Sequence, residues 1–353
     1  MNGNMIPVES RVETKIIGGM FGLEETRGLH SCIPPFLEGQ TILLVNARSG
    51  IFLLIELLSP SHVWLPSYLC GVMLETVNKS SANVRFYEVN YDLAVPSLEW
   101  LSDVQQGDLV ILMDYFGFPC DSSCAAQAKE RGAWVLEDAC QALLSGEVGR
   151  FSDFVLFSPR KFLGVPDGGI LTCRRKIDLN GIDLRNPPAE WWLKAFFSTV
   201  LRREFDIHGG NRRWFELFRQ VDIGGPIGHY AMSEISNMLL RRGFDYSGIA
   251  QRRIDNYAML NDELHDIAVF PSLFSNTVPL GFPIRVENRD RLRQVLFDHE
   301  IYPPVHWPIQ DVVPQEFRDS HRLAKDIMTL PCDQRYDTHD MKRMAKVVLE
   351  ELK

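Results

Sequence analysis

Short apolar runs alternate with amphipathic stretches between residues 41 and 173, a rhythm typical of βα units. Several runs are continuous in Val, Ile, Leu and Phe, as expected for strands covered on both faces. The pattern predicts strands at 62–66, 83–89, 108–114, 133–138, 153–158 and 169–173, and helices at 49–58, 69–78 and 122–131. We therefore expect an α/β unit with a mostly parallel sheet. Such a sheet binds ligands at the carboxyl ends of its strands, so chemistry is expected after Asp114, Asp138 and Ser158.

The pattern changes after residue 175. Residues 175–230 are rich in Trp, Phe and Arg and predict helices and loops that pack on a partner or over a site. A long helical stretch is expected from Ser233 to Leu264. The remainder has two strand-like runs, IAVFP and LGFPIRV, an intervening helix and an amphipathic helix from Thr338. We expect an N-terminal segment (1–40) packing on a large domain (41–245), followed by a small α+β domain (246–353).

The composition is that of a globular protein, because 45% of the 353 residues are hydrophobic and 24% are charged. A net charge of −9 argues against a nucleic-acid partner, which needs a clustered excess of Lys and Arg. No stretch approaches the length of a membrane span, and MNGNMIPVES has neither the basic nor the apolar region of a signal peptide. We expect a soluble, cytoplasmic protein without a membrane partner.

The seven cysteines are an odd number scattered through apolar segments, which favours reduced, buried thiols. Cys120 and Cys124 have the spacing of neighbours on a helix. They lack a second nearby Cys or His pair, so a zinc site is not expected from them, and no other metal is implied.

The segments LEDACQAL and FSPRKFLGVPDGG carry the most informative pair of residues. Asp138 ends one expected strand, and Lys161 lies just past the end of the next. Chemistry with pyridoxal phosphate (PLP) needs a lysine for a Schiff base and a carboxylate that keeps the pyridine nitrogen protonated. Either residue alone reads as a strand-end acid or a solvated loop lysine. The two together, with the turn glycines Gly164, Gly168 and Gly169 behind them, favour a PLP site.

Further residues fit such a site. NARSG begins an expected helix, where free N–H groups and the Ser49 hydroxyl can hold a phosphate, although an ordinary helix cap explains the motif as well. Ser158, three residues before Lys161, is a second hydroxyl that could reach the same phosphate. Tyr68 and Tyr115 are candidates for stacking on a planar cofactor. The sequence contains no dinucleotide, P-loop, zinc-protease or nucleophile-elbow motif.

These segments together resemble the DegT/DnrJ-type (StrS-like) PLP-dependent sugar aminotransferases, which have the aspartate aminotransferase fold, type I. The similarity runs from about residue 40 to the C-terminus. The matching segments are ARSGIF, YFGFP, EDACQAL, FSPRKFLGVPDGG, GHYAMSEI, RRIDNY and LPCDQRY. The resemblance implies a three-layer α/β fold with a mostly parallel central sheet and a smaller C-terminal α+β domain. It also implies a homodimer with shared active sites.

The resemblance implies roles for single residues. Lys161 would bind PLP covalently and then carry the proton of the transamination. Asp138 would pair with the pyridinium nitrogen, and Gln141 would lie near the phenolic oxygen of the cofactor. Ser49 would hold the phosphate.

The chain departs from the family pattern at several positions. His229 and Ala231 stand where the family has the Asn and Arg of the block that reaches the phosphate of the neighbouring subunit. Asp167 stands where Glu is common, and Ala47 and Arg48 stand where Gly and Thr are frequent. Arg48 either pairs with the phosphate or serves the substrate. These differences bear on the substrate class more than on the cofactor.

The sugar dehydratases of this family have histidine in place of the lysine, so Lys161 favours transamination. We expect an aminotransferase that moves an amino group from a donor such as glutamate to a keto group of a nucleotide-linked sugar, in amino-sugar or surface-polysaccharide biosynthesis. One alternative is an enzyme of the same fold with a non-sugar keto substrate. The other is a regulatory protein without turnover, whether it binds PLP or lacks a cofactor.

Overall fold

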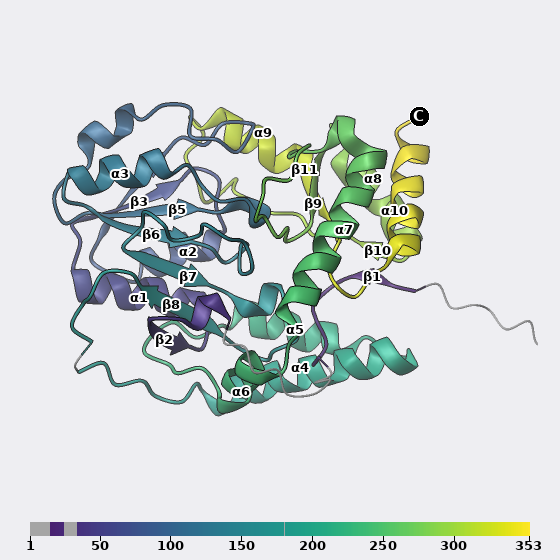
Figure 1. The fold of residues 1–353 in the computed structure, drawn as a ribbon, viewed down its shortest axis with the longest axis horizontal. Helices are drawn as coiled ribbons and strands as arrows, with labels where there is room; N and C mark the ends of the chain where they lie inside the picture. The colour runs from purple at the N-terminus through teal and green to yellow at the C-terminus, as the bar shows by residue number, and fades with distance from the viewer. Residues whose placement is uncertain (1–14, 25–33, 180) are drawn as a thin grey trace, which may run out of the picture.

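The computed structural model describes residues 15–24, 34–179 and 181–353, and its centre is a seven-stranded sheet (Figure 1). The strands lie in the order β2-β8-β7-β6-β5-β3-β4. Their bounds are β2 Gln40–Leu44, β3 His62–Pro66, β4 Asn83–Tyr87, β5 Leu109–Met113, β6 Trp134–Asp138, β7 Phe154–Phe157 and β8 Gly169–Cys173. Only β8 runs against its two neighbours. The mostly parallel sheet expected from the apolar runs is confirmed.

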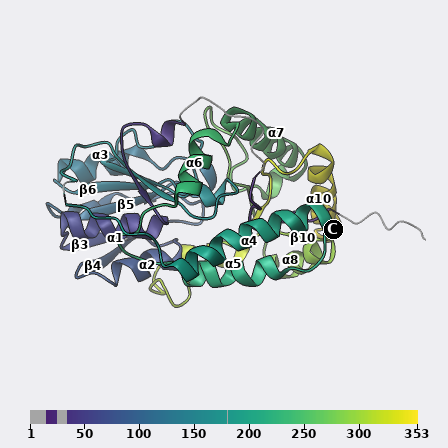
Figure 2. The ribbon, with the colours of Figure 1, turned by 90° about the horizontal axis from the view of Figure 1, so that it is seen from below.

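Helices cover both faces of this sheet. They are α1 Ala47–Leu58, α2 Gly71–Val77 and α3 Ser122–Glu130. The step from β3 through α2 to β4 and the step from β5 through α3 to β6 run in opposite directions along the sheet. Because crossovers between parallel strands are right-handed, the two helices lie on opposite faces. Figure 2 shows α3 on one side of β5 and β6, with α1 and α2 on the other.

The Trp- and Arg-rich region forms a helical hairpin. Its two helices are α4 Ala189–His208 and α5 Arg213–Ile223, and they pack side by side (Figure 2). Trp191 anchors the hairpin, because its indole N–H donates to the carbonyl oxygen of Val221 at 3.0 Å. The hairpin ends in the loop 224–228, which lies against the start of α1.

The C-terminal part is smaller and mixes helices with short strands. Its elements are α7 Tyr246–Leu264, β9 Phe282–Arg285, α8 Arg289–Asp298, β10 Ile301–Tyr302, α9 Arg318–Asp326, β11 Ile327–Leu330 and α10 Thr338–Glu351. Strands β9 and β11 pair antiparallel, and α7 packs on α10. The final helix begins at Thr338 as expected, with Asp337 and Asp340 forming a capping box.

Two expectations for this half are wrong. The stretch from Ser233 to Leu264 is two helices, α6 Glu234–Arg242 and α7, because the chain turns at Gly243 and Asp245 caps a new helix by accepting the Gly248 N–H at 3.0 Å. IAVFP is not a strand. Within it only Ala268 forms an isolated bridge, to Ile284 of β9.

The N-terminal segment pairs with the far end of the chain. Strand β1, Ile17–Gly18, lies parallel to β10. Gly18 has a φ of +107°, and a Cβ there would lie 2.4 Å from the carbonyl oxygen of Tyr302, so the pairing requires glycine. Residues 1–14 and 25–33, including Cys32, lie outside the described residues. No helix in the described ranges is long and apolar enough to cross a bilayer.

Candidate active site

Asp138 and Lys161 come together at the carboxyl edge of the sheet. Asp138 is the last residue of β6 and pairs in register with Leu156 of β7. The chain leaves β7 through a short 3₁₀ turn, Pro159–Lys161, at whose end Lys161 lies. Adjacent parallel strands therefore place the carboxylate and the lysine on neighbouring loops.

Cys140 lies within electrostatic reach of both residues. Its backbone N–H donates to Asp138 Oδ1 at 2.9 Å, and the Asp138 side chain is only 6% exposed. Burial raises the pKa of Cys140, the charge of Asp138 raises it further, and the charge of Lys161 opposes both effects. The buried thiol stays protonated, and both the anion and the cation lie close enough to act on it.

The charge of Lys161 also acts on His306, which the sequence reasoning did not single out. Burial lowers the pKa of His306 to about 3, and the charge of Lys161 contributes to this shift. The imidazole is therefore neutral at physiological pH, with Nδ1 at 3.1 Å from Thr329 Oγ1. His306 comes from the C-terminal part of the chain. The run IYPPVHWP, which begins with β10 and is rich in proline and aromatic residues, was the available signal.

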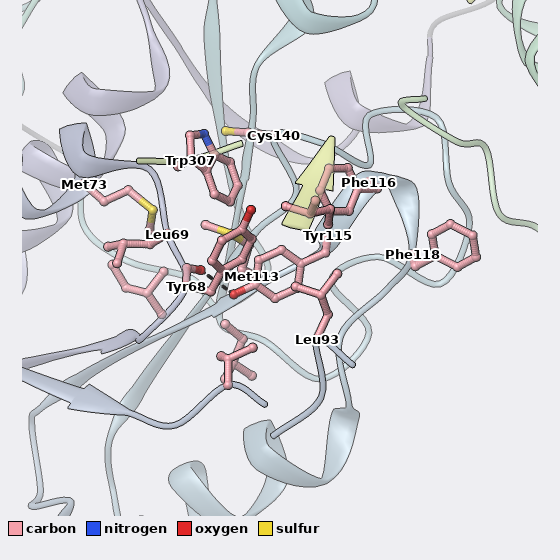
Figure 3. Packing of buried hydrophobic residues seen from close by; sticks show 14 of the residues in the cluster. Tyr68, Leu69, Met73, Leu93, Met113, Tyr115, Phe116, Phe118, Cys140 and Trp307 are labelled. Carbon is pink, nitrogen blue, oxygen red and sulfur yellow. Dashed lines mark hydrogen bonds between the residues drawn. The ribbon is translucent and has the colours of Figure 1, made fainter. Parts of the chain in front are cut away.

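Aromatic rings line the same region. The ring of Tyr68 lies 5.8 Å from that of Tyr115 and 5.4 Å from that of Trp307, as Figure 3 shows. The Tyr115 hydroxyl donates to the carbonyl oxygen of Tyr68. Trp307 follows His306 directly, so one loop of the C-terminal part supplies both residues.

Two buried polar atoms in this region have no hydrogen-bond partner among the described residues. They are the Tyr68 hydroxyl and Gln141 Nε2. The other end of the Gln141 amide is fixed, because its Oε1 accepts the Phe116 N–H at 2.8 Å. Unpaired buried donors are costly, and both belong to residues that the sequence assigned to a cofactor.

The start of α1 lies against the beginning of β8. Asn46 caps the helix by accepting the Ser49 N–H at 3.0 Å. A Cβ on Gly169 would lie 2.2 Å from the backbone of Asn46, so only glycine permits this approach. Gly169 thereby brings the segment after Lys161 to the helix N-terminus, where backbone N–H groups and the Ser49 hydroxyl are grouped.

Two arginines add positive charge near this N-terminus. Arg48 donates to the carbonyl oxygen of Asp222 at 2.6 Å and to that of Gly225 at 3.4 Å, and is thus tied to the end of α5 and the loop after it. Burial lowers the pKa of Arg160; the charge of Arg48 lowers it further, and Asp222 and Asp167 oppose the change. Arg160 directly precedes Lys161 in the segment FSPRKF, yet the sequence reasoning overlooked it.

Ser158 and His229 stand apart from the hydrogen bonds just described. Ser158 precedes the 3₁₀ turn, and its carbonyl oxygen accepts the Lys161 N–H at 3.2 Å. His229 Nε2 lies 2.5 Å from Glu56 Oε2, and its ring packs on Phe52. Both contacts are with side chains of α1, and the hydrogen bonds of His229 and of Ser49 involve different partners.

The sequence profile of the DegT/DnrJ/EryC1/StrS aminotransferase family matches residues 75–349. The chain belongs to this family. The resemblance and the PLP-dependent aminotransferase activity expected from the residues are therefore confirmed. A search of curated protein sequences finds no significant match.

Solved structures confirm the fold of this aminotransferase. Helicobacter pylori PseC, an aminotransferase involved in the biosynthesis of pseudoaminic acid, is similar at a TM-score of 0.69 and 14% identity, over 95% of this chain and 98% of that one. The aminotransferase TlmJ of Streptoalloteichus hindustanus is similar at a TM-score of 0.65 and 20% identity, over 89% of this chain and 87% of that one. The PLP form of Spr1654 from Streptococcus pneumoniae, named as a putative sugar aminotransferase, has a TM-score of 0.61 and 14% identity, over 88% of this chain and 87% of that one.

PLP fits the residues of this aminotransferase. The unpaired Tyr68 hydroxyl and Gln141 Nε2 could donate to its oxygen atoms, and the buried carboxylate of Asp138 could accept its ring N–H. The α1 N-terminus with Ser49 suits a phosphate dianion, which would also relieve the repulsion between Arg48 and Arg160. Each donor or acceptor type that the cofactor requires is present.

Proposed function

We propose that this aminotransferase transfers an amino group from glutamate to a keto group of a nucleotide-linked sugar, in amino-sugar or surface-polysaccharide biosynthesis. The observation that carries the proposed catalytic assignment is that Lys161 lies within electrostatic reach of both Cys140, beside Asp138, and the neutral His306. The sugar class is supported by family membership and by the stated roles of PseC and Spr1654.

Each residue has a distinct task in this proposal. Bound PLP supplies an electron sink for the pair released when a Cα–H bond breaks. Lys161 Nζ holds the cofactor and then accepts and returns the proton. Asp138 keeps the ring nitrogen protonated, while the Gln141 amide and the Tyr68 hydroxyl orient the ring. Ser49, the α1 N-terminus and Arg160 hold the phosphate.

His306 contributes by remaining uncharged. A second cation beside Lys161 would disfavour the substrate's own ammonium group, whereas a neutral imidazole provides a hydrogen-bonding group without repulsion. Trp307 and Tyr115 restrict access of water to the same side, since both rings are buried. The site thus combines fixed polar groups with an apolar wall.

The experiment that tests these assignments begins with borohydride reduction of the purified protein and peptide mapping. We expect a pyridoxyl group on Lys161, loss of this label in Lys161→Arg, and retention in the control Lys79→Arg, whose side chain is exposed just beyond the end of α2 and paired with Glu75. A label on another lysine refutes the assignment. An amine-transfer assay with nucleotide-linked keto sugars and plain keto acids then decides the substrate class. Turnover confined to keto acids rejects the sugar.

We also propose a homodimer with shared active sites. Apolar side chains on α4 and α5 are exposed, among them Leu193, Phe197 and Ile223, and such patches mark interaction surfaces. Mixing inactive Lys161→Ala with His229→Ala subunits tests the sharing directly. If His229 acts across the interface, mixed dimers contain one intact site and activity returns. No gain over the separate variants excludes that role.

The remaining expectations belong to the same proposal. The division into a segment at 1–40, a large PLP-binding domain at 41–245 and a small domain at 246–353 would assign the cofactor residues to the large domain and His306 to the small one.

We also propose that the reaction takes place in the cytoplasm. Reduced cysteines agree with this location, since the six described thiols are free.

A further inference from the structure

Two carboxylates and a thiol gather on the face of β5 and β6 that is turned away from the cofactor residues. Asp114 follows β5, Glu137 lies in β6, and Cys120 precedes α3. Because successive side chains of a strand point to opposite faces, Glu137 points away from its neighbour Asp138. One potential ligand atom from each of Asp114, Cys120 and Glu137 lies within 4.8 Å of the other two.

The two carboxylates are held rigidly and away from water. Asp114 is fully buried, and its Oδ1 accepts the Cys120 N–H at 2.8 Å. Its Oδ2 is buried without a hydrogen-bond partner. Glu137 accepts the Gly149 N–H at 2.8 Å and the Ser152 hydroxyl at 3.2 Å. These donors fix both side chains and leave the Asp114 oxygen unsatisfied.

A buried pair of carboxylates is stabilised by a bound cation or by a shared proton. Arg174 lies within electrostatic reach of Glu137. The buried Oδ2 of Asp114, which has no hydrogen-bond partner among the described residues, is the position that a bound cation would complete.

A cavity of about 200 Å³ reaches the cluster. Cys120 and Glu137 line it, together with Ser122 and Ala125 of α3. Arg150 at its border is paired with Glu147 at 2.8 Å, so its charge is already neutralised. The cavity offers an entry path and room for water molecules that complete a coordination shell.

We propose that Asp114, Cys120 and Glu137 bind a divalent transition-metal ion of the zinc class. Thiolate and carboxylate are ligand types that zinc binds, and water would complete a four-coordinate set with these three side chains. The ion joins the ends of β5 and β6 on the face opposite Asp138, so it stabilises the sheet edge and takes no part in amino transfer. The close spacing of Cys120 and Cys124 is irrelevant to it, since the other two ligands come from distant segments.

Cobalt(II) is the probe, because a cobalt–thiolate bond gives a charge-transfer band in the near ultraviolet. The purified holoenzyme is dialysed against a chelator and titrated with Co²⁺. We expect one equivalent to produce the band in the wild type and in Cys124→Ser, whose thiol is one helical turn further on and buried. Cys120→Ser should lack the band, and Zn²⁺ should abolish it. No band in the wild type, or a band that persists in Cys120→Ser, overturns the proposal.

A thermal melt of the holoenzyme separates the metal from a shared proton. If Zn²⁺ binds, the melting temperature of the wild type rises on its addition, and that of Asp114→Asn does not. If the carboxylates only share a proton, Zn²⁺ leaves the melting temperature of the wild type unchanged, and the proposal is wrong.

Discussion

Replacing Asp138 by Asn removes one negative charge from the carboxyl end of β6 and little else. The side chain is 6% exposed, and Asn retains the oxygen that accepts the Cys140 N–H at 2.9 Å, so the turn after β6 should survive. A hydrogen bond to a charged buried group contributes about 1.5–3 kcal/mol. Without the carboxylate the ring nitrogen of bound PLP would no longer be held protonated and would be a weaker electron sink, so a loss of this size slows proton transfer by about 10- to 150-fold.

The assay is a single-turnover reaction with glutamate, followed by the absorbance of the cofactor. The control is Asp153→Asn, which alters another buried carboxylate at the start of β7, where Oδ2 accepts the Val135 N–H at 3.0 Å. We expect the Asp138→Asn enzyme to bind PLP and react slowly, and the control to react at the wild-type rate. A variant that binds PLP and reacts within about twofold of the wild type refutes the role given to Asp138.

Three further results are expected. Arg160→Gln should weaken PLP binding, measured by an absorbance titration, by about 10- to 150-fold because a charged hydrogen bond to the phosphate is lost. An unchanged affinity would show that Arg160 does not bind the phosphate. Gly169→Ala places a Cβ 2.2 Å from the backbone carbonyl carbon of Asn46 and should lower the free energy of unfolding, measured in urea, by about 1–3 kcal/mol. An unchanged free energy of unfolding would mean that the backbone moves to make room for the methyl group. His306 has a pKa near 3 in the folded protein and about 6.5 in the unfolded chain, so its contribution to stability is complete above pH 6.5 and is lost as the pH falls towards 3. His306→Gln should therefore make the free energy of unfolding in urea less sensitive to acid, and an unchanged pH profile contradicts this assignment.

The sheet could be predicted because buried parallel strands are continuous apolar runs bounded by turns. LVILM and FVLF need no distant information to be recognised as β5 and β7. The pair of helices α6 and α7 was harder. Their apolar periodicity continues across Gly243, and only the capping by Asp245 ends one helix and starts the next.

The site could be predicted only where its residues are close in sequence. Asp138, Gln141 and Lys161 lie on two adjacent strand ends, so their order along the chain reports their proximity. His306 reaches the same place from the C-terminal part, and the run IYPPVHWP marks an unusual loop without indicating that it lies near Lys161. Arg160 was overlooked for a different reason, since a loop arginine is ordinarily solvated and only burial distinguishes it.

The parallel pairing of β1 with β10 affects the order in which the chain can be completed during synthesis. The seven strands of the large sheet are all present once Cys173 has left the ribosome, so this sheet can assemble early. Ile17 and Gly18 are made before any of it, yet their partners Ile301 and Tyr302 emerge long after it, with only α9, β11 and α10 still to follow. The first strand to be synthesised therefore waits for nearly the whole protein, and a chain that stops short of β10 leaves it without a partner.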